Sequence, residues 1–348
     1  MRWQNNEQMA AIPMRTVGPV RIHSEEMNDE VFLPLATFEQ PLWPSTHRGA
    51  KVCNAAGGIK VLVSDERMTR SVIVEAARVE QLWSVQREIK QKLDVLQSIV
   101  AEHSRFAKLL EINSEIVGSL LYLRFEFFTA DASGHNMATL AAEKLLNWIL
   151  ANYPELNYVS ISGNYCSDKK ASAVNGILGR GKHVVAEVII PELVCKKMLK
   201  TTAKRVVELN VKKNLIGGIL AGSIRSANAH FANMLLAFYL ATGQDAANII
   251  EGSQGIVYAE DRDGALYFSV TLPNIIVGAI GNGKDLPFVQ QNLQLLGCQE
   301  TRVPGANARR LAAIAAACVL CGELSLLAAQ TNPGELMRSH LKLERKHQ

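Results

Sequence analysis

The segment NARRLAAIAAACVLCGELSLLAAQ, residues 307–330, limits the possible folds most strongly because it is the only candidate for a membrane-spanning helix. Its uninterrupted apolar run, from Leu311 to Cys321, is well short of the roughly 20 residues that a bilayer needs. Arg309, Arg310 and Glu323 lie at the two ends of this run. We therefore predict a long buried helix near residues 306–330 of a soluble protein, without a membrane span.

The length and composition indicate a folded globular protein of two domains or one elaborated domain. The chain has 348 residues, of which 48% are hydrophobic and 20% charged. The net charge is +4, and no long lysine and arginine block or alternation of aromatic and basic residues occurs. These features exclude a typical nucleic-acid-binding surface, whereas a modest positive charge is compatible with small anionic ligands.

The six cysteines, at positions 53, 166, 195, 298, 318 and 321, indicate reduced thiols of a cytoplasmic protein. The N-terminal sequence MRWQNNEQMA lacks the apolar region of a signal peptide. Cys318 and Cys321 form a CxxC pair inside the predicted buried helix, and no second CxxC is present. Helix packing therefore explains this pair better than a metal or redox site, and we predict no bound metal.

The hydrophobic periodicity predicts a mixed α and β protein. Residues 1–71 indicate short strands and irregular structure, and the last ten residues indicate a mobile polar tail. We expect helices and strands to alternate between about 72 and 160, as one compact unit. The predicted helices are 72–104, 136–154, 191–202 and 228–245, and the predicted strands are 115–130, 156–162, 183–191 and 264–273.

Two polar segments are candidates for chemistry. SGNYCSDKKASAVNG, residues 162–176, places an aspartate and two lysines after a predicted strand. It is either a solvated surface loop or a site for an anionic substrate that carries a carbonyl. DASGHN, residues 131–136, follows a strand and begins a helix, so its N–H groups could hold a phosphate, although a helix-capping turn explains it equally well.

Three further ionisable residues occur in settings that suggest a role. Glu39 and Asp245 are embedded in apolar sequence, and His340 lies near the C-terminus. Each of them alone is more often structural, and spacing does not connect them with Lys169. Together with that lysine they are sufficient for acid–base chemistry on a carbonyl group.

Several of these segments, in the same order, resemble the 3-hydroxy-3-methylglutaryl-CoA (HMG-CoA) reductase family from about Leu33 onwards. The matching runs are SGNYCSDKKASAVNGILGRGKHVVAEVIIP, LKTTAKRVVELNVKKNLIGGILAGS, NAHFANMLLAFYLATGQDAANI, LYFSVTLPNIIVGAIGNG, PGANARRLAAI and GELSLLAA. They are more similar to the biosynthetic, class I-like branch than to the degradative branch. The membrane anchor of eukaryotic members is not part of the resemblance.

The resemblance implies an α+β fold and a two-step reduction. A large HMG-CoA domain, residues 1–71 and 161–348, would surround the long helix, with a ferredoxin-like NAD(P)-binding domain, 72–160, inserted into it. The family reduces HMG-CoA to mevalonate and CoA with NADPH, in homodimers or homotetramers whose active sites lie between subunits. NADH is the alternative cofactor. Two other functions stay open: an NADH-linked degradative enzyme that oxidises mevalonate, and a non-catalytic CoA-binding homologue.

The resemblance also assigns roles to individual residues. Lys169 would stabilise the oxyanion on the thioester carbonyl, and Asp245 would hydrogen-bond this lysine. Glu39 would donate a proton during carbonyl reduction, and His340 would protonate the departing CoA thiolate. Residues expected to bind the hydroxymethylglutaryl group are Arg70, Ser162, Asp168 and Lys170.

The remaining matches concern CoA and the nicotinamide cofactor. Residues expected to contact CoA or its thioester end are Ser45, Arg48, Lys200, Lys213, His230, Asn233 and Ser339. Residues expected to bind the cofactor are Ser104, Arg105, Phe106, Asp131, Ser133, Gly134, His135, Asn136, Met137, Ile280, Gly281 and Arg345. Ser133 and His135 stand where the family more often has methionines.

Overall fold

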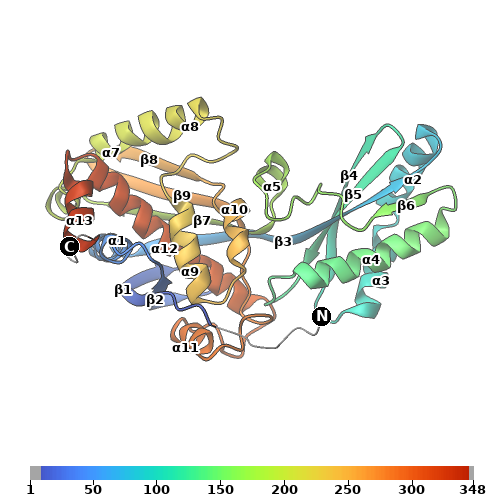
Figure 1. Ribbon diagram of the computed structural model, residues 1–348, viewed down its shortest axis with the longest axis horizontal. Helices are drawn as coiled ribbons and strands as arrows, with labels where there is room; N and C mark the ends of the chain where they lie inside the picture. The colour runs from blue at the N-terminus through green and yellow to red at the C-terminus, as the bar shows by residue number, and fades with distance from the viewer. Residues whose placement is uncertain (1–8, 345–348) are drawn as a thin grey trace.

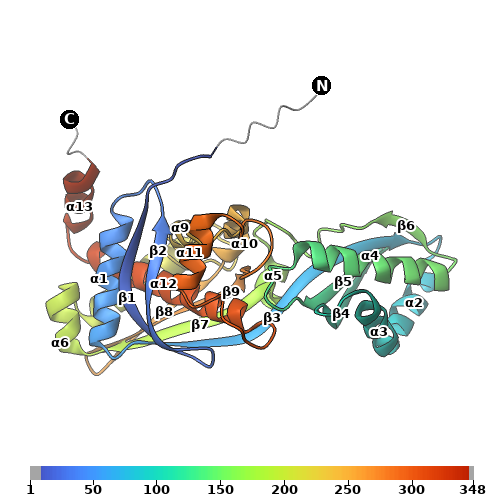
Figure 2. The same ribbon diagram turned by 90° about the horizontal axis from the view of Figure 1, so that it is seen from below.

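The computed structural model describes residues 9–344 and has two lobes joined by one long strand (Figures 1 and 2). Each lobe has its own cluster of buried apolar side chains. We call them the large lobe and the small lobe. The strand that joins them is β3 (Ile59–Glu75).

The large lobe contains most of the chain. Its elements, besides the first half of β3, are β1 (Met14–His23), β2 (Asn28–Ala36), α1 (Leu42–Ala55), α5 (Ala173–Leu178), β7 (Gly181–Ile190), α6 (Glu192–Val194), the π-helix η1 (Cys195–Leu199), α7 (Ala203–Leu209), the π-helix η2 (Asn210–Ile216), α8 (Gly217–Leu220), α9 (Phe231–Ala241), the 3-10 helix η3 (Ala246–Asn248), α10 (Ile249–Gly252), β8 (Ile256–Arg262), β9 (Ala265–Ile275), α11 (Pro287–Leu295), α12 (Ala306–Gln330) and α13 (Glu335–Glu344).

Helix α12 forms the centre of the large lobe. The strands are ordered β2-β1-β3-β7-β9-β8, and α12 packs against this sheet together with α1 and α9. Helix α1 approaches α12 closely at Gly49, where a Cβ atom would lie 2.0 Å from the carbonyl oxygen of Cys321. Cys318 and Cys321 are buried free thiols within α12, in agreement with the predicted helix packing.

The small lobe consists of one antiparallel sheet and three helices. Its elements, besides the second half of β3, are α2 (Val79–Gln91), α3 (Leu93–His103), β4 (Lys108–Val117), β5 (Leu120–Phe128), α4 (His135–Asn152) and β6 (Asn157–Ser160). Pairing of β6 with β3, β3 with β5 and β5 with β4 gives the order β6-β3-β5-β4. Apolar side chains of α2, α3 and α4 complete the core of this lobe.

The mixed α and β class is confirmed, but the prediction for residues 59–75 is wrong. The long strand β3 stands where short strands and irregular structure were expected up to residue 71, and it replaces the start of the helix expected at residue 72. Its first half pairs with β7 and its second half with β5, so each half fulfils its backbone hydrogen bonds in a different lobe. This pairing outweighs the helical spacing of the local sequence.

Two shorter segments also differ from the prediction. The single strand expected at 115–130 is a hairpin, because Gly118 and Ser119 form a two-residue turn between β4 and β5. The C-terminal residues expected to be a mobile tail continue the helix α13 as far as Glu344.

The apolar part of helix α12 extends beyond the uninterrupted run from Leu311 to Cys321. By length and composition alone it could cross a membrane, with a mean hydropathy of 2.2 over an 18-residue window. However, 94% of that window is buried inside the protein. The burial, rather than the length of the run, identifies α12 as a core helix.

Candidate active site

Lys169 and Asp245 form an ion pair in the large lobe. Lys169 lies in the loop after β6, and Asp245 begins the short helix η3 after α9. The Lys169 Nζ and Asp245 Oδ2 atoms are 2.7 Å apart, and the two side chains are 40% and 43% exposed. The bond to Asp245 raises the pKa of Lys169. Burial alone would raise the pKa of Asp245, but Lys169 and the Ala247 N–H lower it.

Asp168 lies in the loop between β6 and α5, residues 161–172, which we call the lysine loop. It connects this loop with both lobes. Its Oδ1 atom accepts a hydrogen bond from Arg180 Nη2 at 2.7 Å and lies 3.5 Å from His135 Nε2 in the small lobe. Partial burial favours the protonated carboxyl, but His135 and Arg180 outweigh this effect and lower the pKa of Asp168 well below its usual range. Asp168 is therefore a carboxylate at neutral pH.

The backbone of the lysine loop is held by buried polar side chains that the sequence analysis missed. Glu251 Oε1 accepts the Lys169 N–H at 3.1 Å. Gln254 accepts the Ser172 N–H at 3.3 Å and donates to the Ser172 carbonyl at 3.0 Å. Asn175 Nδ2 donates to the Ser167 carbonyl at 2.8 Å. The available signal for Glu251 was a lone carboxylate in NIIEGSQGIV, the same kind of signal that identified Asp245.

The other predicted hydroxymethylglutaryl-binding residues surround this loop. Arg70 on β3 donates from Nε to the Ile161 carbonyl at 3.1 Å. The Ser162 N–H donates to Ser160 Oγ at 3.0 Å. Lys170 is exposed and donates from Nζ to the Asp168 carbonyl at 3.2 Å.

Glu39 lies in a separate polar pair. Asn233 Nδ2, on the first turn of α9, donates to Glu39 Oε2 at 2.8 Å. Within residues 9–344, no hydrogen bond or ion pair joins Glu39 to Lys169 or Asp245. Glu39 is therefore bonded to a predicted CoA-contacting residue, whereas Lys169 and Asp245 are bonded to each other.

Several predicted CoA-binding residues surround the C-terminal half of α12. Ser45 Oγ and Arg48 Nε, both on α1, each donate to Ser325 Oγ at 3.0 Å. Arg48 also pairs with Glu335 of α13 at 2.5 Å. Lys200, which has a φ of 55°, accepts a hydrogen bond on its carbonyl from Asn332 Nδ2 at 3.1 Å.

His230 and Lys213 lie near a second buried carboxylate, Glu323 of α12. This carboxylate accepts the backbone N–H of Ala229 at 2.9 Å and of His230 at 2.5 Å. The His230 Nε2 atom is 3.8 Å from Glu323 Oε1. Burial raises the pKa of Glu323, and the charges of His230 and Lys213 oppose this shift. Burial lowers the pKa of Lys213, because it disfavours the charged ammonium group. The signal for Glu323, a lone charge in an apolar helix, was present in the sequence.

The predicted cofactor-binding residues of two turns meet between the lobes. The turn before α4 contains Asp131 and Ser133, and the turn after β9 contains Ile280 and Gly281. Ala132 and Ile280 pair as a parallel β-bridge, and Asp131 accepts the N–H of Ala279 at 2.8 Å. At Gly278 a Cβ atom would lie 2.4 Å from the Ser133 nitrogen, so only glycine permits this approach.

Asp131 has a structural function in this turn. Its side chain accepts the N–H groups of Gly305 and Ala308, both at 3.0 Å, at the N-terminus of α12. The carboxylate therefore joins the small lobe to the central helix.

Gly134 is the N-cap residue of α4, and no side chain caps this end of the helix. The first residues of the helix are His135, Asn136, which is exposed, and Met137. Met137 packs against the core of the small lobe.

A further predicted cofactor-binding segment lies at the same end of the small lobe as the turn before α4, because Lys108 pairs with Phe128 in the β4–β5 hairpin. This segment consists of Ser104, Arg105 and Phe106. Ser104 Oγ accepts the Ala107 N–H at 2.9 Å. The Arg105 guanidinium carbon lies 5.5 Å from the centre of the Phe106 ring. Phe106 is 45% exposed.

Three predicted site residues cannot be placed in full. Arg345 lies outside the described residues. Ser339 and His340 are part of helix α13, but their side chains lie outside the described part of the structure.

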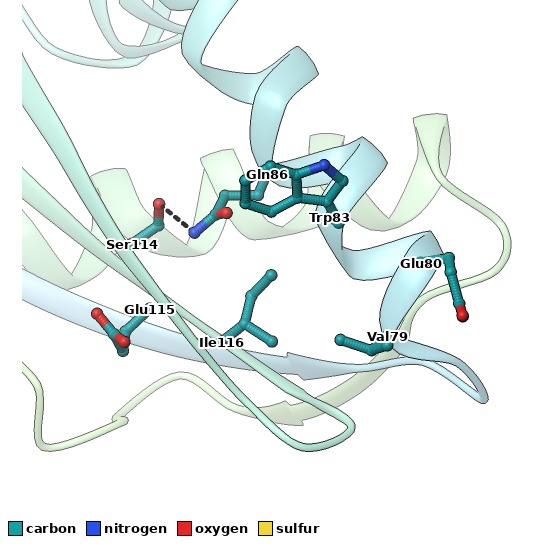
Figure 3. A pocket seen from close by; sticks show the side chains of 7 residues that line it. All are labelled: Val79, Glu80, Trp83, Gln86, Ser114, Glu115 and Ile116. Atoms are coloured by element: carbon teal, nitrogen blue, oxygen red, sulfur yellow. Dashed lines mark hydrogen bonds between the residues drawn. The ribbon is translucent and has the colours of Figure 1, made fainter.

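A cavity of about 490 Å³ lies on the small lobe, between α2 and β4 (Figure 3). Val79, Trp83 and Ile116 form its apolar lining, and Gln86 donates to Ser114 at 3.0 Å within it. None of the predicted site residues line this cavity, so we do not place the reaction there. Among the described residues, no cluster of three histidine, cysteine, aspartate or glutamate side chains could hold a metal ion.

The chain matches a known protein family over almost its whole length. The family model described as hydroxymethylglutaryl-coenzyme A reductase matches residues 7–345. The chain belongs to the HMG-CoA reductase family. The match extends over almost all of the residues discussed above.

Relatives from archaea and eukaryotes agree with the predicted class I-like branch of HMG-CoA reductase. The chain is 44% identical over 337 residues to 3-hydroxy-3-methylglutaryl-coenzyme A reductase of Pyrococcus abyssi, covering 96% of this chain and 82% of the relative. It is 42% identical over 345 residues to 3-hydroxy-3-methylglutaryl-coenzyme A reductase 2 of Dictyostelium discoideum, covering 96% and 64%.

A solved structure supports the fold alone. The chain superimposes with a TM-score of 0.74 on a class II 3-hydroxy-3-methylglutaryl-CoA reductase from Streptococcus pneumoniae that is bound to NADPH. The sequence identity is 20%, and the match covers 94% of this chain and 87% of the other.

Proposed function

We propose that this protein reduces HMG-CoA to mevalonate and CoA, with NADPH as hydride donor, for isoprenoid synthesis. The observation that carries the proposal is the Lys169–Asp245 ion pair in a chain that belongs to the HMG-CoA reductase family. No feature of the described structure favours mevalonate degradation or a non-catalytic CoA-binding function.

Lys169 acts as the electrophile of this reaction. When hydride reaches the thioester carbonyl, negative charge develops on the carbonyl oxygen. The ammonium group stabilises that charge, because a fixed cation is effective where charge develops in a site that excludes water. Asp245 orients the ammonium group and keeps Lys169 protonated, in agreement with its raised pKa.

Two further residues handle protons. Glu39 donates a proton to the carbonyl oxygen, and its bond to Asn233 fixes the direction of its carboxyl group. His340 protonates the CoA thiolate when the hemithioacetal breaks down to mevaldehyde. An unprotonated thiolate would otherwise add back to the aldehyde and re-form the hemithioacetal.

The substrate extends from the lysine loop along α12. Arg70, Ser162, Asp168 and Lys170 bind the hydroxymethylglutaryl end. The CoA end lies near α1 and α12, with contacts from Ser45, Arg48, Lys200, Lys213, His230, Asn233 and Ser339. The basic residues in this group match the anionic phosphates of CoA.

NADPH fits the turns between the lobes. The cofactor supplies hydride to the substrate carbonyl. Helix α4 begins without a side-chain cap, so its first N–H groups are available to a phosphate. A Cβ atom at Gly281 would meet no other atom within 4 Å, which leaves open space at this turn. Arg105 is an exposed cation at the same end of the small lobe, and Arg345 would contact the 2′-phosphate.

We further propose that the lobes correspond to domains, residues 1–71 with 161–348 and residues 72–160. The small lobe is ferredoxin-like in this proposal. Its support is the strand order β6-β3-β5-β4 together with the connection β3-helices-β4-β5-α4-β6. The two separate apolar clusters support these boundaries, although strand β3 crosses the boundary between residues 71 and 72.

We also propose a homodimer or homotetramer with active sites between subunits, in the cytoplasm. Two observations support the assembly: the Lys169–Asp245 pair is about 40% exposed, and Glu39 is not joined to it within one chain. A second chain would cover the pair and exclude water. The six free cysteines, all buried, support a reducing compartment.

The test is product formation by the purified protein. With HMG-CoA and NADPH, we expect mevalonate and free CoA, and a much lower rate when NADH replaces NADPH. Faster oxidation of mevalonate with NAD⁺ and CoA than reduction of HMG-CoA would instead favour the degradative function. Binding of HMG-CoA without any turnover would favour the non-catalytic homologue.

A further inference from the structure

We propose that Glu251 and Arg180 are positioning residues that hold Lys169 in its reactive orientation. This inference rests on the proposed function, because it concerns the lysine that acts on the substrate carbonyl. Neither Glu251 nor Arg180 is expected to touch the substrate.

Lys169 has an unusual backbone conformation. Its φ is 54°, in the left-handed region that residues with a side chain rarely adopt. Ser167 and Asn164 in the same loop also have positive φ, at 47° and 58°. Surrounding contacts must therefore hold the loop in this shape.

One short segment, residues 245–251, binds both the side chain and the backbone of Lys169. Asp245 binds its Nζ atom at 2.7 Å, and Glu251 binds its backbone N–H at 3.1 Å. The two carboxylates belong to one short segment, in which Asp245 is the N-cap residue of η3 and Glu251 lies in α10, which follows directly. The side chain and the backbone of the lysine are thus fixed relative to the same element.

Glu251 is fully buried, whereas Asp245 and Lys169 are partly exposed. Burial raises the pKa of Glu251, and the Lys169 N–H and the charge of Arg180 oppose this shift. Burying a carboxylate costs free energy unless the group is hydrogen-bonded. The hydrogen bond that Glu251 accepts from the Lys169 N–H offsets part of this cost.

Arg180 completes the support from the other side of the loop. It is 2% exposed, and its Nη1 atom donates to the Thr69 carbonyl at 2.8 Å and Thr69 Oγ1 at 2.6 Å. Its Nη2 atom donates to Asp168 at 2.7 Å, and its Nε atom lies 3.5 Å from Glu251 Oε1. The guanidinium group therefore ties the residue before Lys169 to both β3 and Glu251.

The experiment compares Glu251→Ala with Glu251→Gln in the full-length protein. The glutamine oxygen can still accept the Lys169 N–H, so we expect it to retain kcat within about threefold of the wild type. Alanine removes the acceptor, and we expect kcat to fall at least tenfold. The KM for NADPH should change less than twofold in both variants. A kcat of Glu251→Ala within twofold of wild type, or equal losses in both variants, would overturn the proposal.

Arg180→Lys and a matched control provide a second test that remains valid when Glu251→Ala does not fold. Lysine cannot contact Thr69, Asp168 and Glu251 together, so we expect kcat to fall at least fivefold. Arg310→Lys is the control, since Arg310 is also buried but binds Asp29 and the Leu296 carbonyl. Equal kcat values for the two variants would contradict the assignment of Arg180.

Hydrogen exchange separates this proposal from the proposed function. We expect amide exchange in residues 162–176 to accelerate at least tenfold in Glu251→Ala and to stay near wild type in Glu251→Gln. Unchanged exchange would refute the positioning role, whether or not the protein turns over HMG-CoA. An inactive wild-type protein whose exchange follows this pattern would refute only the reductase function.

Discussion

At the residue scale, the proposed function depends most on one ammonium group, that of Lys169. We expect Lys169→Ala to lower kcat for HMG-CoA and for added mevaldehyde by about a hundredfold to a thousandfold, the typical cost of removing one oxyanion donor. Steady-state kinetics with both substrates measure this effect. Lys170→Ala is the matched control, and it should raise the KM for HMG-CoA more than it lowers kcat. Equal kcat losses for the two lysines would show that Lys169 has no special role.

A second prediction at this scale separates the two reductions. His340→Gln should slow the reduction of HMG-CoA much more than the reduction of mevaldehyde, because only the first reaction releases a CoA thiolate. The ratio of the two kcat values, compared with the wild type, measures the difference. A similar loss with both substrates would contradict the role of His340.

A third prediction follows from the low pKa of Asp168. Because its pKa is lower in the folded than in the unfolded protein, Asp168 stabilises the fold above the unfolded pKa of about 4, and this contribution is lost as the pH falls further. The difference in unfolding free energy between wild type and Asp168→Asn should therefore be largest near pH 7 and shrink below about pH 4. Urea unfolding at a series of pH values tests this, and a difference that grows on acidification would contradict it.

The sequence named candidate site residues but not the contacts between them. Lys169 and Asp245 were identified separately, and only the resemblance to a family joined them. Glu251 and Arg180 were not selected because their roles lie in contacts that the fold makes, Glu251 with the Lys169 N–H and Arg180 with Thr69 and Asp168. The Glu251–Lys169 and Arg180–Thr69 contacts join residues that are 82 and 111 positions apart, and no local pattern records such contacts.

At the scale of the elements, the contact between α1 and α12 depends on a glycine. A Cβ atom at residue 49 would lie 2.0 Å from the Cys321 carbonyl oxygen, so we expect Gly49→Ala to destabilise the protein by roughly 1–3 kcal/mol or more. Urea unfolding measures the change. Gly217→Ala is the control, because its Cβ would meet only the Lys212 carbonyl oxygen, at 3.7 Å, and it should be neutral or slightly stabilising. Equal stability of both variants would contradict the close packing.

Local pattern predicted some elements well and others badly. Helix α12 was predicted because its apolar residues are continuous, and strand β7 because apolar residues dominate its sequence, with Glu187 as the one charged residue between Val184 and Ile190. Strand β3 was not, since its two halves pair in different lobes and VIVEAARVE has helical spacing when considered alone. The Gly118–Ser119 turn, in contrast, was a hairpin signal that the sequence analysis overlooked.

At the scale of the whole molecule, the partly exposed Lys169–Asp245 pair predicts that activity requires assembly. We expect active protein to sediment as a dimer or tetramer, and specific activity to fall when dilution dissociates it. Active-enzyme sedimentation measures both properties together. A monomer with full specific activity would contradict active sites between subunits.

The most direct test of the central claim is the stoichiometry of the reaction. NADPH oxidation and mevalonate formation should be measured together in the same sample, first with HMG-CoA and then with mevaldehyde. A reductase of this family oxidises two NADPH for each mevalonate formed from HMG-CoA and one for each formed from mevaldehyde, and we predict these ratios. One NADPH per HMG-CoA consumed, with mevaldehyde as the final product, would contradict the account, as would no oxidation at all.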